Sequence, residues 1–138
     1  MHFFRHTPYG KECAEVLKVS AELFENNGFK TNVNTEYGYA LSYFGNEDAK
    51  DIGVFSHGDV VPVGDDWIKC KPFEPIVENG SVFGRGCNDD KSGIITALYV
   101  AKAIKELIDK FDFKNVEILD GRGVTTMYGN KGGVIVSF

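Results

Sequence analysis

The amino-acid sequence predicts an α/β fold, with a mixed sheet flanked by helices. Two stretches, residues 10–27 and 89–109, carry apolar side chains at the helical spacing of three or four residues. Between them, short apolar or alternating runs at 29–33, 37–44 and 51–55 have the length and composition of strands. The order of helix, strands, helix and further strand is typical of the α/β class.

Both predicted helices have one apolar face that is suited to cover a sheet. On the first helix this face carries Ala14, Leu17, Ala21 and Phe24, and Asn27-Gly28 is a common signal for the end of a helix. On the second helix the corresponding set is Ile94, Ala97, Leu98, Ala101, Ile104 and Ile108.

The strands are predicted from short apolar runs and from turn residues. The run at 51–55 is bounded by polar residues, which is typical of a buried central strand. Asn79-Gly80 separates runs at 75–78 and 81–83 and predicts a two-residue hairpin. Further strands are expected at 116–119 and at 124–128, the latter in a hairpin with 134–138.

Composition excludes several classes of protein. The 138 residues carry a net charge of −5 and no basic patch, so we expect no nucleic-acid partner. No apolar run reaches the ~18 residues of a membrane span, and we expect no membrane partner. Three cysteines without a CxxC pair favour reduced thiols, and the first ten residues are too polar for a signal peptide. Together these features favour a cytoplasmic protein.

His57 and Asp59 follow the predicted strand at 51–55, and ligand sites of α/β sheets lie beyond the carboxyl ends of strands. Residues two apart on an extended segment point the same way, so Asp59 can pair with His57. A carboxylate on one ring nitrogen prepares the other nitrogen to bind a metal. The alternative is a surface histidine in a loop, without a function.

The segment Gly84-Arg-Gly86-Cys-Asn-Asp89-Asp90-Lys91 leads into the second predicted helix. An aspartate at this position can bridge two divalent cations. Capping of the helix is an alternative, because carboxylates are favoured at helix N-termini. A dinucleotide-binding loop is a weaker alternative, because Asp89 stands where the third glycine should be.

Five short motifs occur in one order: HGDVVP (57–62), GDDW (64–67), PFEP (72–75), NG (79–80) and GRGxxDDK (84–91). In this order they resemble the dinuclear zinc peptidases that include aminoacylases, succinyl-diaminopimelate desuccinylase, carboxypeptidase G and the dipeptidases. Within that family the resemblance is greatest to the PepV-type dipeptidase and carnosinase branch. It covers about residues 10–110.

The resemblance implies a partial zinc-peptidase catalytic domain and a set of roles. His57 would bind one Zn²⁺, and Asp89 would bridge the two Zn²⁺ of a complete site, with Co²⁺ or Mn²⁺ as substitutes. Asp59 would serve catalysis by orienting His57, and the peptide bond between Asp89 and Asp90 would be cis. The substrate would be a dipeptide or an N-acyl amino acid, hydrolysed by a metal-activated water. Trp67 would lie near the substrate cleft or simply pack in its loop.

The chain departs from the family pattern after the second predicted helix. The family continues with a strand that ends in Gly-x-Asp-Glu-Glu, which supplies the general base and a further ligand. Here 116–119 is followed by Asp120-Gly-Arg-Gly, and no Glu-Glu pair occurs in the sequence.

We therefore expect residues 1–123 to be the N-terminal part of the catalytic domain and residues 124–138 to begin the strands of the lid domain. In this interpretation the chain is truncated or internally deleted. The alternative to a hydrolase is a catalytically incomplete metal-binding or interaction fragment of the same family. The sequence does not predict an oligomeric state.

Overall fold

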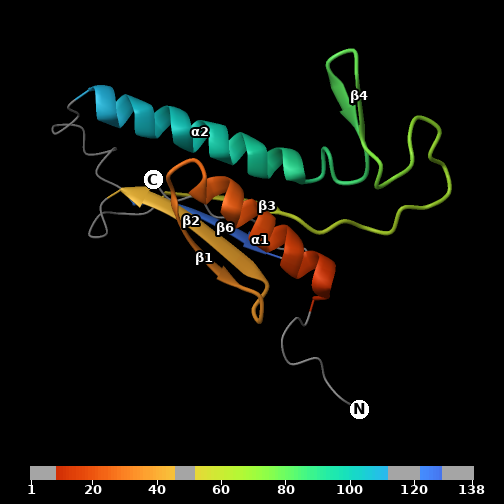
Figure 1. Ribbon diagram of the computed structural model, residues 1–138, viewed down its shortest axis with the longest axis horizontal. Coiled ribbons are helices and arrows are strands. Elements are labelled where there is room, and N and C mark those ends of the chain that lie inside the picture. Colours follow the sequence, from red (N-terminus) through yellow and green to blue (C-terminus); the bar gives the residue numbers. More distant parts are fainter. Residues whose placement is uncertain (1–8, 46–51, 112–121, 129–138) are drawn as a thin grey trace.

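The computed structural model describes residues 9–45, 52–111 and 122–128. Two helices and six strands occur in these ranges, in an α/β arrangement (Figure 1). Their bounds are α1 Lys11–Glu25, β1 Lys30–Asn34, β2 Tyr39–Gly45, β3 Ile52–His57, β4 Ile76–Glu78, β5 Ser81–Phe83, α2 Lys91–Lys110 and β6 Arg122–Tyr128. None of the described helices combines the length and apolar character that a membrane span requires.

The main sheet is mixed, as the sequence predicts. Its strand order is β1-β2-β6-β3, with antiparallel pairing between β1 and β2 and between β2 and β6. The pairing of β6 with β3 is parallel, and His57 at the end of β3 is opposite Tyr128. A parallel pair needs a long crossover, and α2 lies in the chain between these two strands.

Both helices lie on the same side of the main sheet in Figure 1. An apolar core joins them to the sheet and buries the predicted face of α1 and that of α2 as far as Ala101. Ile104 and Ile108, the last two residues of the predicted second face, are only half-buried. Phe24 is 1% exposed, and its ring meets Phe29 edge-on with centroids 5.6 Å apart. The core residues are Leu17, Ala21, Phe24, Phe29, Ala40, Ile94, Ala97, Leu98 and Ala101.

The ends of the helices follow from local chemistry. α1 ends at Glu25, and Gly28 adopts a φ of 80°, a left-handed conformation that glycine accepts without steric penalty. α2 begins at Lys91, two residues later than predicted. Asp89 and Asp90 therefore lie in the turn before the helix.

The hairpin predicted at Asn79-Gly80 is confirmed. Both residues have positive φ values, 50° and 75°, as a two-residue hairpin turn requires. The turn joins β4 to β5 in a separate two-stranded sheet, which Figure 1 shows projecting away from the main sheet.

Two strand predictions need correction. The strand predicted at 51–55 extends to His57, and among the described strands it lies at the edge of the main sheet rather than in its centre. β6 has β2 on one edge and β3 on the other, so the predicted hairpin of 124–128 with 134–138 is wrong. The strand predicted at 116–119 lies outside the described residues, as does 134–138.

Candidate metal site

The candidate site lies where the end of β3 meets the turn that precedes α2. β3 ends at His57, and Asp59 follows two residues later. Asp89 and Asp90 come directly before the first residue of α2. The fold thus brings together two segments that are more than 30 residues apart in the sequence.

His57 and Asp89 face one another across this junction. The Nε2 atom of His57 lies 2.9 Å from Oδ1 of Asp89. The side chain of Asp89 is 78% exposed and that of His57 is 26% exposed. The space beside these two atoms is therefore open to solvent and to a small ligand.

The other ring nitrogen of His57 is held by Asp59. Nδ1 lies 3.1 Å from Oδ1 of Asp59 and 3.2 Å from the backbone oxygen of the same residue. A proton on Nδ1 satisfies these two acceptors. Nε2 then faces Asp89, to which it donates when the ring is protonated, and its lone pair is available to a cation when the ring is neutral. This is the pairing that the spacing of the two residues predicts.

The charges around His57 change its proton affinity. Partial burial of the ring acts to lower its pKa. The negative charge and backbone oxygen of Asp59, together with the carboxylate of Asp89, outweigh this effect. The net result is a pKa of His57 above its ordinary value of 6.5. The site therefore favours a positive charge at this position, whether a proton or a cation.

Asp90 points back toward β3. Its Oδ2 atom lies 2.6 Å from Oγ of Ser56 and accepts a hydrogen bond of 3.3 Å from the backbone N–H of His57. The Ser56 hydroxyl is also 2.9 Å from the backbone oxygen of Asp90. Asp90 is at the N-cap position of α2, yet its side chain makes no capping hydrogen bond. The capping interpretation therefore does not explain this aspartate.

The peptide bond between Asp89 and Asp90 is cis, which confirms the expectation drawn from the resemblance. The Ser56–Asp90 contact was not predicted. Its signal in the sequence is a serine in an otherwise apolar strand, directly before the histidine.

The residues present fit a metal ion in part. Imidazole nitrogen and carboxylate oxygen are both ordinary zinc ligands. Two such atoms on one tetrahedral Zn²⁺ lie roughly 3.3 Å apart, so a small opening of the His57–Asp89 contact would be enough. Within residues 9–45, 52–111 and 122–128, no group of three or more His, Cys, Asp or Glu side chains is arranged to hold a metal.

The loop residue Trp67 has a structural role. Its Nε1–H donates a hydrogen bond of 2.7 Å to the backbone oxygen of Val63, and the guanidinium of Arg85 lies 5.1 Å from the centre of its ring. Arg85 also donates to the backbone oxygen of Val63. These contacts support the packing interpretation of Trp67.

A cavity of ≈ 600 Å³ adjoins the site on the side of Asp59. Neither His57 nor Asp89 lines it, so it is not the space between these two side chains. Its lining includes the thiol residues Cys13 and Cys87 and the cation Lys91. Burial, together with the negative charges of Asp59 and Glu12, raises the pKa of the Cys13 thiol.

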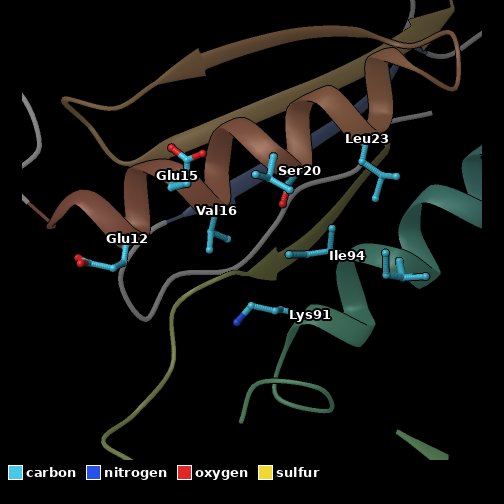
Figure 2. Close-up of a pocket in the computed structure, with 9 residues that line it drawn as sticks. Glu12, Glu15, Val16, Ser20, Leu23, Lys91 and Ile94 are labelled. Atoms are coloured by element: carbon cyan, nitrogen blue, oxygen red, sulfur yellow. The ribbon is translucent and has the colours of Figure 1, made fainter. Parts of the chain in front are cut away.

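A second hollow, of ≈ 430 Å³, separates α1 from the first turns of α2. Figure 2 shows Val16, Ser20 and Leu23 on α1 directed toward Ile94 on α2. Its lining includes none of the three predicted site residues. This groove is therefore separate from the candidate site.

Sequence comparisons show the family to which the chain belongs. Residues 53–121, half of the chain, match peptidase family M20/M25/M40, and the chain belongs to that family. The matched segment contains His57, Asp59 and Asp89 together with α2. The resemblance drawn from the five motifs is thereby confirmed.

Individual relatives carry dipeptidase names. The chain is 37% identical over 100 residues to "Putative dipeptidase YtjP" of Bacillus subtilis (strain 168), covering 72% of this chain and 21% of that protein. It is 34% identical over 107 residues to a "Putative dipeptidase" of Staphylococcus epidermidis, covering 78% and 22%. A third relative, "Putative dipeptidase SH1171" of Staphylococcus haemolyticus, is 32% identical over 108 residues, with the same coverage of 78% and 22%. The chain spans about a fifth of the length of these relatives.

Proposed function

We propose that the chain carries the first metal-binding residues of a zinc-dependent, dipeptidase-like metallopeptidase. His57 and Asp89 bind the metal, and Asp59 orients His57. The observation that carries the proposal is the alignment of His57, with Nε2 2.9 Å from Asp89 and Nδ1 held by Asp59 at 3.1 Å. Membership in a peptidase family and dipeptidase names among the relatives support this assignment.

Each residue has a definable task in this function. Asp59 holds the proton on Nδ1 of His57 and keeps the Nε2 lone pair available. The exposed carboxylate of Asp89 offers two oxygens, enough to bridge two ions. When bound, zinc lowers the pKa of a coordinated water and polarises a substrate carbonyl. A complete site would hold two Zn²⁺, which Co²⁺ or Mn²⁺ could replace.

The substrate class follows from the family. We propose a dipeptide or an N-acyl amino acid, cleaved at its peptide or amide bond by hydrolysis. The reduced-thiol composition favours the cytoplasm. We propose neither a nucleic-acid nor a membrane partner.

A second candidate is a catalytically incomplete metal-binding or interaction fragment. It is favoured by the absence of a Glu-Glu pair from all 138 residues, because this pair would supply the general base and a further ligand. General-base catalysis typically contributes 10²- to 10⁴-fold in rate, as an order of magnitude. Loss of this group would leave metal binding without turnover.

Metal binding tests the proposed ligands, and hydrolysis of a panel of dipeptides and N-acyl amino acids tests whether these 138 residues are sufficient for turnover. The 138-residue chain is assayed with Zn²⁺, Co²⁺ or Mn²⁺ beside a control without protein. We expect the chain to bind metal and to show no turnover above the control. Turnover that is lost in Asp89→Ala and kept in Asp109→Asn, an exposed aspartate near the end of α2, would overturn the incomplete-fragment candidate.

A further inference from the structure

We propose that Ser56 and Asp90 form a clamp that fixes the distance between His57 and Asp89, and that Gly93 provides the space for it. Ser56 and Asp90 are positioning residues in this proposal, because each acts through the ligand residue beside it. The inference rests on the proposed metal-binding function. It assigns a role to two side chains that the metal site itself does not use.

The contacts of the clamp join a buried serine to a half-buried aspartate. Ser56 is 1% exposed, and its Oγ lies 2.6 Å from the Asp90 carboxylate and 2.9 Å from the Asp90 backbone oxygen. The same carboxylate oxygen accepts the backbone N–H of His57 at 3.3 Å. A hydrogen bond to a charged group is stronger than one between two neutral groups.

The position of the clamp in the chain gives it its function. Ser56 is bonded directly to His57, and Asp90 is bonded directly to Asp89. A contact between the two outer residues therefore restricts the relative movement of the two inner ones. The intervening chain contains a long loop over 58–75, which by itself cannot hold two side chains in register. The clamp joins the ends of that connection.

Gly93 has a reason to be glycine at this point in α2. A Cβ atom built on it would lie 2.5 Å from Oδ1 of Asp90 and 2.5 Å from Oγ of Ser56. Both distances are far below van der Waals contact, so any side chain would push the two partners apart. Gly93→Ala thus perturbs the clamp without altering Ser56, Asp90, His57 or Asp89.

Cobalt binding provides the test, because Co²⁺ substitutes for Zn²⁺ and its visible spectrum reports coordination geometry. The affinity of the 138-residue chain for Co²⁺ is measured by competition with a chromophoric chelator. Ser56→Ala should weaken binding by ~10–100-fold, the range found when a residue supporting a ligand is removed. Ser42→Ala, which removes another buried hydroxyl (5% exposed) from strand β2, should leave the affinity unchanged.

A double-mutant cycle distinguishes a clamp from general damage to the fold. Asp90→Ala should weaken Co²⁺ binding at least as much as Ser56→Ala does, because it also removes the acceptor of the His57 N–H. The double variant should be no worse than Asp90→Ala alone, because Ser56 then has no carboxylate left to contact. Asp90→Asn keeps an oxygen that accepts from Ser56 and from the His57 N–H. The affinity loss in Asp90→Asn should be clearly smaller than in Asp90→Ala, since a neutral oxygen retains part of each hydrogen bond. If Ser56→Ala does not fold, the clamp is tested by comparing the Co²⁺ affinity of Asp90→Asn with that of Asp90→Ala.

The outcomes are distinct. Additive losses, or an Asp90→Asn variant as weak as Asp90→Ala, would overturn the clamp and indicate a role for the charge itself. Unchanged affinity and spectrum in Ser56→Ala and Gly93→Ala would overturn the clamp alone. A wild-type chain that binds no Co²⁺ would overturn the proposed function together with the clamp.

Discussion

Replacing Asp59 with asparagine tests how His57 is held in the candidate site. The carboxylate of Asp59 lies 3.1 Å from Nδ1 of His57, and its side chain is only 17% exposed. The substitution keeps the size of the side chain and removes its charge. The ring loses its negatively charged partner while the ligand pair of His57 and Asp89 stays intact.

The structure limits the size of the effect. The backbone oxygen of Asp59 is also 3.2 Å from Nδ1, and no side-chain substitution removes it. The proton therefore keeps an acceptor, and the ring keeps its orientation in part. Changes of this kind weaken metal binding by ~10–100-fold, and we expect Asp59→Asn to fall near the lower end, about 10-fold.

The measurement is the Zn²⁺ affinity of wild-type and variant chains, obtained by competition with a chelator at pH 7.5. Asp65→Asn, which changes an exposed aspartate of the nearby loop, is the matched control and should bind Zn²⁺ as the wild type does. An unchanged affinity in Asp59→Asn would refute the role of Asp59. Complete loss of binding would also refute it, because Asp59 would then be a ligand.

Three further results are expected. The raised pKa of His57 in the metal-free chain means that its ion pairs stabilise the fold below pH 6.5, and this stabilisation is lost as the pH rises through the folded-state pKa. His57→Gln should therefore lower the unfolding temperature more at about pH 5.5 than at about pH 8.5. Burial and the charge of Asp59 raise the pKa of Cys13, so mass-spectrometric mapping should find slow alkylation of Cys13 at pH 8 and faster alkylation in Asp59→Asn. Denaturant unfolding should show that Phe24→Ala, in the core, costs ~3–5 kcal/mol, whereas Val19→Ala on an exposed position costs less than about 0.5 kcal/mol.

The helices and the tight hairpin could be predicted because their signals are local. The spacing of Leu17, Ala21 and Phe24 defines a buried face whatever lies against it. Asn79 and Gly80 accept the positive φ values of a two-residue turn, and few other pairs do so. In both cases the information lies within a few consecutive residues.

The order of strands in the sheet could not be predicted in the same way. A short apolar run such as that in β3 has the same composition in the centre of a sheet as at its edge when helices cover it. The position of β6 depends on hydrogen bonds to strands that are more than 65 residues away in the sequence. For this reason the sequence did not predict that β3 lies at the edge of the described sheet, nor that β6 pairs with β2 and β3.

In the candidate site, too, contacts between residues close in sequence could be predicted and contacts between distant residues could not. The pairing of Asp59 with His57 follows from residues two apart on an extended segment. The approach of Asp89 to His57 was implied only by the family resemblance, because 32 residues separate the two side chains. For the contact of Ser56 with Asp90, the sequence shows only a serine in an otherwise apolar strand and does not indicate its partner, since a buried serine is usually satisfied by its own backbone.

The central claim is that His57 and Asp89 bind the same metal ion. Zinc content after dialysis, combined with X-ray absorption at the zinc edge, tests it directly in the wild-type chain, His57→Ala, Asp89→Ala and the control Asp109→Asn. We predict that the wild type and the control retain zinc with one imidazole ligand, and that either alanine variant loses it. Zinc retained at wild-type stoichiometry in Asp89→Ala, or an imidazole signal that survives in His57→Ala, would contradict the account.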